Sequence, residues 1–118
     1  AASDVYKRQL FPWSSQARGF FVNQVEFAAN EHFANPTDEE EKRVWHDDLN
    51  LARRDRAIEL AKEKGCQPIQ IALSYVVNLE ISAYPLVGPR NFFELDSCIE
   101  ATNIDLSPQE LRYLEKGE

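Results

Sequence analysis

The sequence predicts an α/β protein, and within that class the closing part of a larger sheet structure. Two short apolar segments, residues 10–13 and 83–87, are predicted strands, and about 70 residues of mostly helical pattern separate them. The second strand leads through a Gly-Pro-Arg-Asn turn directly into a helix. Two strands are too few to close a sheet, and a parallel sheet needs cover on both faces. We therefore expect a fold that is incomplete by itself.

Composition and charge narrow the class of protein. The chain has 118 residues, 43% hydrophobic and 28% charged, which fits one globular domain or part of one. The net charge of −7 argues against general nucleic-acid binding, which needs clustered positive charge. No apolar run approaches the length of a membrane span, so we expect no membrane partner. Cys66 and Cys98 lack metal-ligand spacing, which predicts reduced thiols in a cytoplasmic protein.

The chain begins with a segment that does not fit the rest of the sequence. Residues 1–9, AASDVYKRQ, have no hydrophobic period and look like a read-through scar at the end of an assembled sequence. We expect them to be non-native and the native domain to occupy residues 10–118. After the strand at 10–13 we predict a loop over 14–21, and residues 22–37 are irregular and polar.

Three helices are predicted between the two strands. Thr37 is the expected N-cap of the first, because the acidic run DEEE suits a helix N-terminus, and this helix should end near Trp45. The second covers residues 49–64, with Gly65 as its C-cap. The third begins at Pro68. Its apolar residues cover two sides, which predicts wide burial: Ile69, Ile71, Ala72, Leu73, Tyr75, Val76, Val77 and Leu79.

Two further helices come after the second strand. Apolar residues return at helical spacing after the GPRN turn, which predicts a helix over 91–102. Ser107 and Glu110 then form a capping box, with Pro108 in the first turn of the last helix.

Several of these segments together resemble one enzyme family. PWSSQARGFF, AIELAKEKGCQPIQIALSYVV and PLVGPRNFFELDSCIEATNIDLSPQELRYLE, in this order, resemble the C-terminal third of an aldo-keto reductase over about residues 10–117. The resemblance implies a (β/α)8 TIM barrel, with residues 10–13 as strand seven and 83–87 as strand eight. It also implies an NADP(H) cofactor and a small carbonyl substrate. In barrels of this kind, phosphate is often held by the loops after these two strands.

The turn after the second strand is the first candidate cofactor site. Helix N-termini offer unsatisfied N–H groups to phosphate, Gly88 allows close approach, and Arg90 adds a planar fork of donors. By resemblance, Arg90 is expected to read the 2′-phosphate of NADP. Glu94, Ser97 and Cys98 match positions at the adenine end, where the family commonly has Gln, Glu and Asn. The alternative for GPRN is an ordinary turn with a solvated arginine.

The loop after the first strand is the second candidate. By resemblance, Trp13 takes the position of the aromatic residue that stacks on the nicotinamide ring. The residues expected to run along the pyrophosphate and ribose are Ser14, Ser15, Gln16, Ala17, Arg18 and Gly19. The alternative makes Trp13 a core aromatic residue and the serines turn formers.

No catalytic or metal-binding residue is expected in this chain. The family's Asp, Tyr, Lys and His come from the first half of the barrel, and none of those motifs occurs here. The resemblance therefore implies an NADP-dependent oxidoreductase of which this fragment alone is inactive. His32 and His46 lack convergent ligands and are expected to be solvated.

Two other functions remain open. One is a non-catalytic, NADP-sensing regulatory subunit on the same barrel, which an upstream sequence without the catalytic set would indicate. The other is a free-standing helical interaction domain, which the two strands and the phosphate-type turn disfavour.

Overall fold

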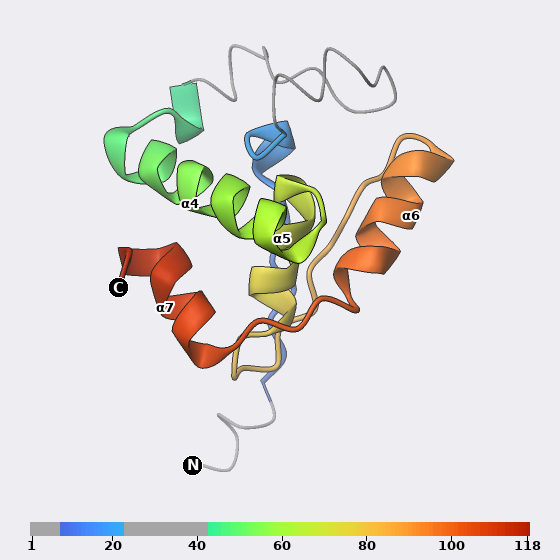
Figure 1. Ribbon diagram of the computed structural model, residues 1–118. Helices are drawn as coiled ribbons and strands as arrows, with labels where there is room; N and C mark the ends of the chain where they lie inside the picture. The colour runs from blue at the N-terminus through green and yellow to red at the C-terminus, as the bar shows by residue number, and fades with distance from the viewer. Residues whose placement is uncertain (1–7, 23–42) are drawn as a thin grey trace.

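A computed structural model describes residues 8–22 and 43–118 of the chain (Figure 1). Four helices form its body: α4 (Asp48–Lys64), α5 (Pro68–Val77), α6 (Phe92–Ala101) and α7 (Pro108–Lys116), preceded by a short 3-10 helix, η1 (Ala17–Gly19). The expectations for residues 1–7, His32 and the N-cap Thr37 lie outside the described residues.

The ends of α4 are set by local sequence. Asp47 caps the helix by accepting a 2.8 Å hydrogen bond from the Asn50 N–H. At the other end Gly65 adopts a left-handed φ of 68°, which confirms the predicted C-cap. Residues 43–45 are also helical, as expected for the end of the preceding helix near Trp45.

Helix α5 is the centre of the molecule. Pro68 is its first residue, and the backbone N–H of Gln67 donates to the Gln70 side chain at 2.8 Å. The predicted wide burial is confirmed, and the buried residues are Pro68, Gln70, Ile71, Ala72, Leu73 and Ser74. In Figure 1, α4 and α6 lie beside α5, and both make contacts with it. These neighbours explain why α5 has no wide solvent face.

Two apolar clusters hold the helices together. The larger one joins α4, α5 and α7, and its buried residues are Ala57, Leu60, Ala61, Ile71, Leu106 and Leu114. The smaller one joins α5 to α6 through Leu73, Cys98 and Ala101. The predicted capping box of α7 is present, because the Glu110 N–H donates to Ser107 Oγ and the Ser107 N–H donates to the Glu110 carboxylate.

The two predicted strands are much shorter than expected. Within the described residues they are reduced to one isolated parallel bridge between Leu10 and Ala83, and no longer strand forms over 10–13 or 83–87. Their parallel direction agrees with the expected topology. The extent of the two strands was therefore predicted wrongly.

Proline explains the interruption. On one side of the bridge, the Tyr84 N–H donates to the Leu10 carbonyl at 2.7 Å. Further along, the Leu86 N–H donates to the Pro12 carbonyl at 2.8 Å. A continuous ladder would need an N–H from residue 12, but proline has none. The pairing therefore continues without its alternate hydrogen bond.

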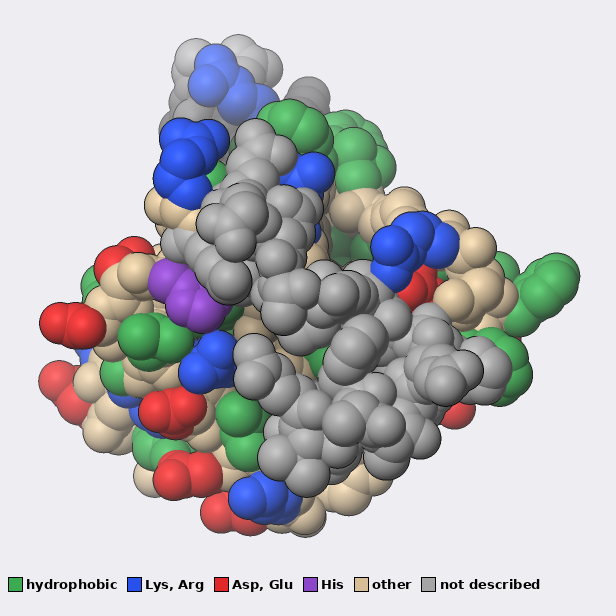
Figure 2. Space-filling model, turned by 90° about the horizontal axis from the view of Figure 1, so that it is seen from above, with side chains coloured by type: hydrophobic (Ala, Val, Ile, Leu, Met, Phe, Trp, Pro, Cys, Tyr) green, Lys and Arg blue, Asp and Glu red, His purple; other side chains and the backbone are tan. Residues whose placement is uncertain are grey.

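The described residues leave many large apolar side chains exposed. Figure 2 shows hydrophobic side chains reaching the surface at the right, where α6 lies. Those on the paired segments are Leu10, Phe11, Trp13, Tyr84, Leu86 and Val87, and those on α6 are Phe92, Phe93, Leu95 and Ile99. Apolar residues at a sheet face normally pack against further strands and helices. None of the described helices has the length and apolar character needed to cross a membrane.

Candidate functional site

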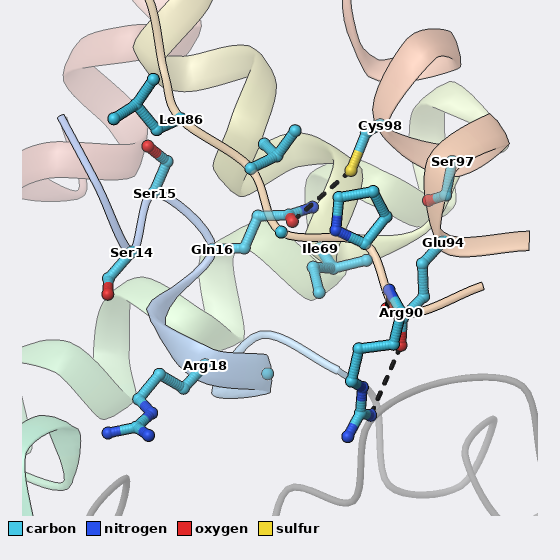
Figure 3. A pocket seen from close by; sticks show the side chains of 14 residues that line it. Ser14, Ser15, Gln16, Arg18, Ile69, Leu86, Arg90, Glu94, Ser97 and Cys98 are labelled. Atoms are coloured by element: carbon cyan, nitrogen blue, oxygen red, sulfur yellow. Dashed lines mark hydrogen bonds and ion pairs between the residues drawn. The ribbon is translucent and has the colours of Figure 1, made fainter. Parts of the chain in front are cut away.

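A cavity of about 480 Å³ lies between η1, the turn before α6 and the side of α6 (Figure 3). Its volume falls within the range of roughly 300–1,000 Å³ that small-molecule sites occupy. Its lining residues are Ser14, Ser15, Gln16, Arg18, Gly19, Ile69, Leu86, Val87, Gly88, Pro89, Arg90, Glu94, Ser97 and Cys98. The cavity therefore joins the two loops that come directly after the bridged segments.

The first loop is tightly wound and strained. Ser14, Ala17 and Arg18 all have φ near +50°, a region that L-residues seldom adopt. Hydrogen bonds within the loop hold this shape, since the Ala17 N–H donates to the Ser14 carbonyl at 2.8 Å and the Gly19 N–H donates to Gln16 at 3.2 Å. Ala17 is buried and anchors the loop. Strain of this kind is often found at functional sites.

The second loop ends in the N-terminus of α6. Asn91 caps the helix by accepting a 2.9 Å hydrogen bond from the Glu94 N–H. The Glu94 carboxylate accepts from the Arg90 N–H at 2.7 Å. It also forms an ion pair with the Arg90 guanidinium, 3.4 Å between Nη2 and Oε1. The predicted phosphate reader therefore has a carboxylate as its neighbour.

Two buried polar groups on α6 face the cavity. The Ser97 hydroxyl is buried and has no hydrogen-bond partner among the described residues. An unpaired buried hydroxyl is costly, so this atom is suited to a group that enters the cavity. Cys98 Sγ lies 3.6 Å from Gln16 Oε1, which connects α6 to the first loop (Figure 3). Burial raises the pKa of the Cys98 thiol, which keeps it protonated as the donor of this contact.

A buried amide positions α6 beside α5. Gln70 Nε2 donates to the Ser97 carbonyl at 3.2 Å and to the Glu100 carboxylate at 2.9 Å. Ser74 Oγ lies 2.7 Å from both the Gln70 and the Ala101 carbonyl oxygens. Neither residue was predicted from the sequence, although two polar residues at i and i+4 inside an apolar helix were a usable signal.

The structure brings most of the predicted residues together. Ten of the twelve line the cavity: Ser14, Ser15, Gln16, Arg18, Gly19, Gly88, Arg90, Glu94, Ser97 and Cys98. Ala17 is buried beneath the loop instead, and Trp13 is 82% exposed and outside the lining. Figure 3 shows that Arg18 and Arg90 come from the two different loops and that the Arg18 side chain extends away from Arg90.

The fold of the described residues does not require a glycine at residue 88, in the second loop. A Cβ added at Gly88 would meet no atom within 4 Å, and its φ is not in the left-handed region. The space above Gly88 is therefore open to a ligand. The charged lining groups are two arginines and one glutamate, in a chain with a net charge of −7. The donor set fits an anionic ligand.

Elsewhere, the described part of the chain brings no three His, Cys, Asp or Glu side chains together as a metal site. His46 is exposed, and its ring lies 5.3 Å from that of Phe20. Cys66 and Cys98 are both free thiols.

Comparison with known proteins points to one family. The family described as "Aldo/keto reductase family" matches residues 7–117. Norsolorinic acid reductase A of Aspergillus parasiticus is 28% identical over 92% of this chain and 26% of its own length. Versiconal hemiacetal acetate reductase of the same species is 30% identical over 91% of this chain and 31% of its own length. The chain thus spans less than a third of either relative.

Proposed function

Because the chain belongs to the aldo/keto reductase family, we propose that it supplies the last two strands and final helices of an NADP(H)-dependent carbonyl reductase barrel. Members of this family are NAD(P)-dependent oxidoreductases on a TIM barrel. The proposed reaction is hydride transfer to an aldehyde or ketone. The chain's own contribution is the grip on the cofactor.

The position of the cavity is the observation that carries this proposal. In TIM barrels the site lies at the carboxyl ends of the strands, and phosphate is often held by the loops after strands seven and eight. Leu10 and Ala83 pair in parallel, and the two loops after them line the same cavity. This arrangement supports residues 10–13 and 83–87 as neighbouring final strands of the barrel.

The lining residues support an adenine dinucleotide with a 2′-phosphate. Arg90 would pair with that phosphate, and Gly88 would let the backbone approach it. The unpartnered Ser97 hydroxyl and Glu94 would bind the adenosine end. Gln16 and Arg18, in the strained loop, would contact the pyrophosphate and ribose. When bound, NADPH supplies the hydride. These residues would hold the dinucleotide and orient it in the site.

The acid–base chemistry would come from residues outside this chain. Protonation of the carbonyl oxygen needs a positioned general acid. Tyr75 and Tyr84 do not fit that role, because packing accounts for both: Tyr75 packs against the larger apolar cluster, and the Tyr84 ring stacks on Phe11 with ring centroids 5.7 Å apart. Tyr75 donates to Glu115, and its pKa is raised to about 12 by burial and by that hydrogen bond.

The test compares the 118-residue chain with the complete protein that contains it. We expect the complete protein to oxidise NADPH in the presence of aldehydes or ketones, and the chain alone to stay at the buffer rate. A purified chain whose turnover is lost on mutating one of its own residues would contradict the fragment interpretation. A complete protein that binds NADPH but reduces no carbonyl would favour the NADP-sensing regulatory alternative. The two relatives above are named reductases, which supports the enzyme.

A further inference from the structure

The carboxylate of Glu94 occupies the cavity beside the residue that we assign to the 2′-phosphate. It accepts from the Arg90 N–H at 2.7 Å and pairs with the Arg90 guanidinium at 3.4 Å. The Glu94 side chain is 15% exposed, whereas that of Arg90 is 63% exposed. Arg90 can therefore swing toward a ligand, while Glu94 is held in place.

The carboxylate is not needed to cap α6. Asn91 already accepts the hydrogen bond from the Glu94 N–H at 2.9 Å. In the first turn of α6 the carboxylate also interacts favourably with the helix dipole. Its specific contact is with Arg90, and one amide oxygen could accept the same backbone N–H. A charge at this position is therefore not required for the hydrogen bonds that cap α6 or for the one that binds the Arg90 N–H.

That charge acts differently on the two forms of the cofactor. A 2′-phosphate approaching Arg90 must displace or repel the carboxylate, because like charges at close range are unfavourable. A free ribose 2′-hydroxyl can instead donate to the carboxylate, and such bonds to charged acceptors are strong. The same carboxylate thus weakens binding of the cofactor that carries a 2′-phosphate and favours binding of the cofactor that lacks it.

We propose that Glu94 sets the cofactor preference of this site by holding Arg90 and lowering the discrimination of NADPH over NADH. The inference rests on the proposed function, since it assumes that the cavity holds the adenosine end of the dinucleotide. It makes Glu94 a specificity-determining residue that lets the site accept both cofactors.

The test is calorimetric titration of the complete protein with 2′,5′-ADP and 5′-AMP, which differ in the 2′-phosphate. Glu94→Gln keeps the size of the side chain and an acceptor for Arg90 N–H. We expect Glu94→Gln to raise the affinity for 2′,5′-ADP about tenfold, because it removes one like charge close to the 2′-phosphate. The affinity for 5′-AMP should stay equal or fall. NADPH and NADH should show the same order. Glu94→Ala serves as a second variant and should shift the ratio in the same direction.

The matched control is Asp96→Asn, which removes one negative charge from the same helix at an exposed residue outside this cavity. It should leave the ratio of the two affinities unchanged. Equal effects of Glu94→Gln on both nucleotides, or an equal shift from Asp96→Asn, would overturn the inference while leaving the proposed function intact. Absence of binding of either nucleotide and of either dinucleotide to the wild-type protein would overturn both.

Discussion

The side-chain amide of Gln70, on α5, donates a 2.9 Å hydrogen bond to the carboxylate of Glu100, on α6. The same amide reaches the Ser97 carbonyl, so one buried residue fixes the helix that borders the cavity. The position of the proposed adenosine site thus depends on a residue that does not line its cavity.

Gln70→Leu should lower both stability and nucleotide affinity. The change removes the donor to the buried Ser97 carbonyl and to the exposed Glu100 carboxylate, and it removes the acceptor of the Gln67 N–H. The buried contact carries most of the loss, roughly 1–3 kcal/mol of unfolding free energy. Chemical denaturation measures that loss, and titration with 2′,5′-ADP measures the effect on the site. Glu100→Gln keeps an acceptor and should cost less. An unchanged affinity in a destabilised Gln70→Leu protein would show that α6 is positioned by other contacts.

Arg90→Ala should weaken the binding of NADPH much more than the binding of NADH. A charge-assisted hydrogen bond to phosphate contributes about 1.5–3 kcal/mol. We expect the lower end, about tenfold, because the Arg90 guanidinium must leave Glu94 and is largely exposed. Fluorescence titration of the complete protein with each cofactor measures the two losses.

Arg18→Ala is the companion variant in the same titration. Arg18 is assigned to the pyrophosphate that both cofactors share, and its side chain extends away from Arg90 (Figure 3). Arg18→Ala should weaken the binding of NADPH and of NADH to the same extent. Equal losses for Arg90→Ala would instead return Arg90 to the class of solvated turn residues.

Gly88→Ala should separate folding from binding. The added methyl group meets no protein atom within 4 Å and the φ is ordinary, so the melting temperature should not fall. The methyl group would enter the space assigned to the cofactor, so both NADPH and NADH should bind more weakly. Thermal melting and titration of one preparation give both results. Unchanged affinity would mean that no ligand approaches the backbone at this residue.

Ionisation of Glu110 should contribute a small part of the unfolding free energy, and this part should be lost at acid pH. Burial opposes ionisation, but hydrogen bonds from Lys64 and Ser107 outweigh it and lower the pKa of Glu110 below its ordinary 4.5. The ionised form thus stabilises the fold above pH 4.5, and this contribution is lost as the pH falls through the lowered pKa.

The matched change is Glu110→Gln, which keeps the capping box but removes the 2.8 Å ion pair with Lys64. The loss should be less than about 1 kcal/mol at neutral pH, because the pair is partly exposed. Urea unfolding of both proteins from pH 7 to pH 2 should show the difference disappearing in acid. If the two unfolding free energies still differ at pH 2, the effect of Glu110→Gln comes from packing and not from the charge.

The isolated 118-residue chain should be marginally stable or prone to aggregate. Phe92 is 81% exposed and Trp13 is 82% exposed, and the bridged segments have no further strand beside them among the described residues. We expect strong binding of a hydrophobic dye and a broad thermal transition. Sharp, reversible, two-state melting of a monomer would contradict this and favour a self-contained domain.

Local chemistry was predictable from the sequence. Gly65 as a helix end, Pro68 as a helix start and the pairing of Ser107 with Glu110 all depend on residues within one helical turn of each other. Hydrogen bonds over three or four residues form wherever the local sequence permits, so the pattern determines them. The order of the segments likewise predicted the family, which the match over residues 7–117 confirms.

Tertiary structure decided what the pattern could not. The strands were overestimated because Pro12 interrupts a ladder whose other half lies about 70 residues away. The exposure of Trp13, the Gln70 network and the contact of Cys98 with Gln16, 82 residues apart, were equally hidden. Such contacts depend on which distant surfaces meet when the helices pack. The sequence alone thus determined the helix ends, the family and most of the candidate cofactor residues, whereas packing determined which side chains share the cavity and which groups hold α6 beside it.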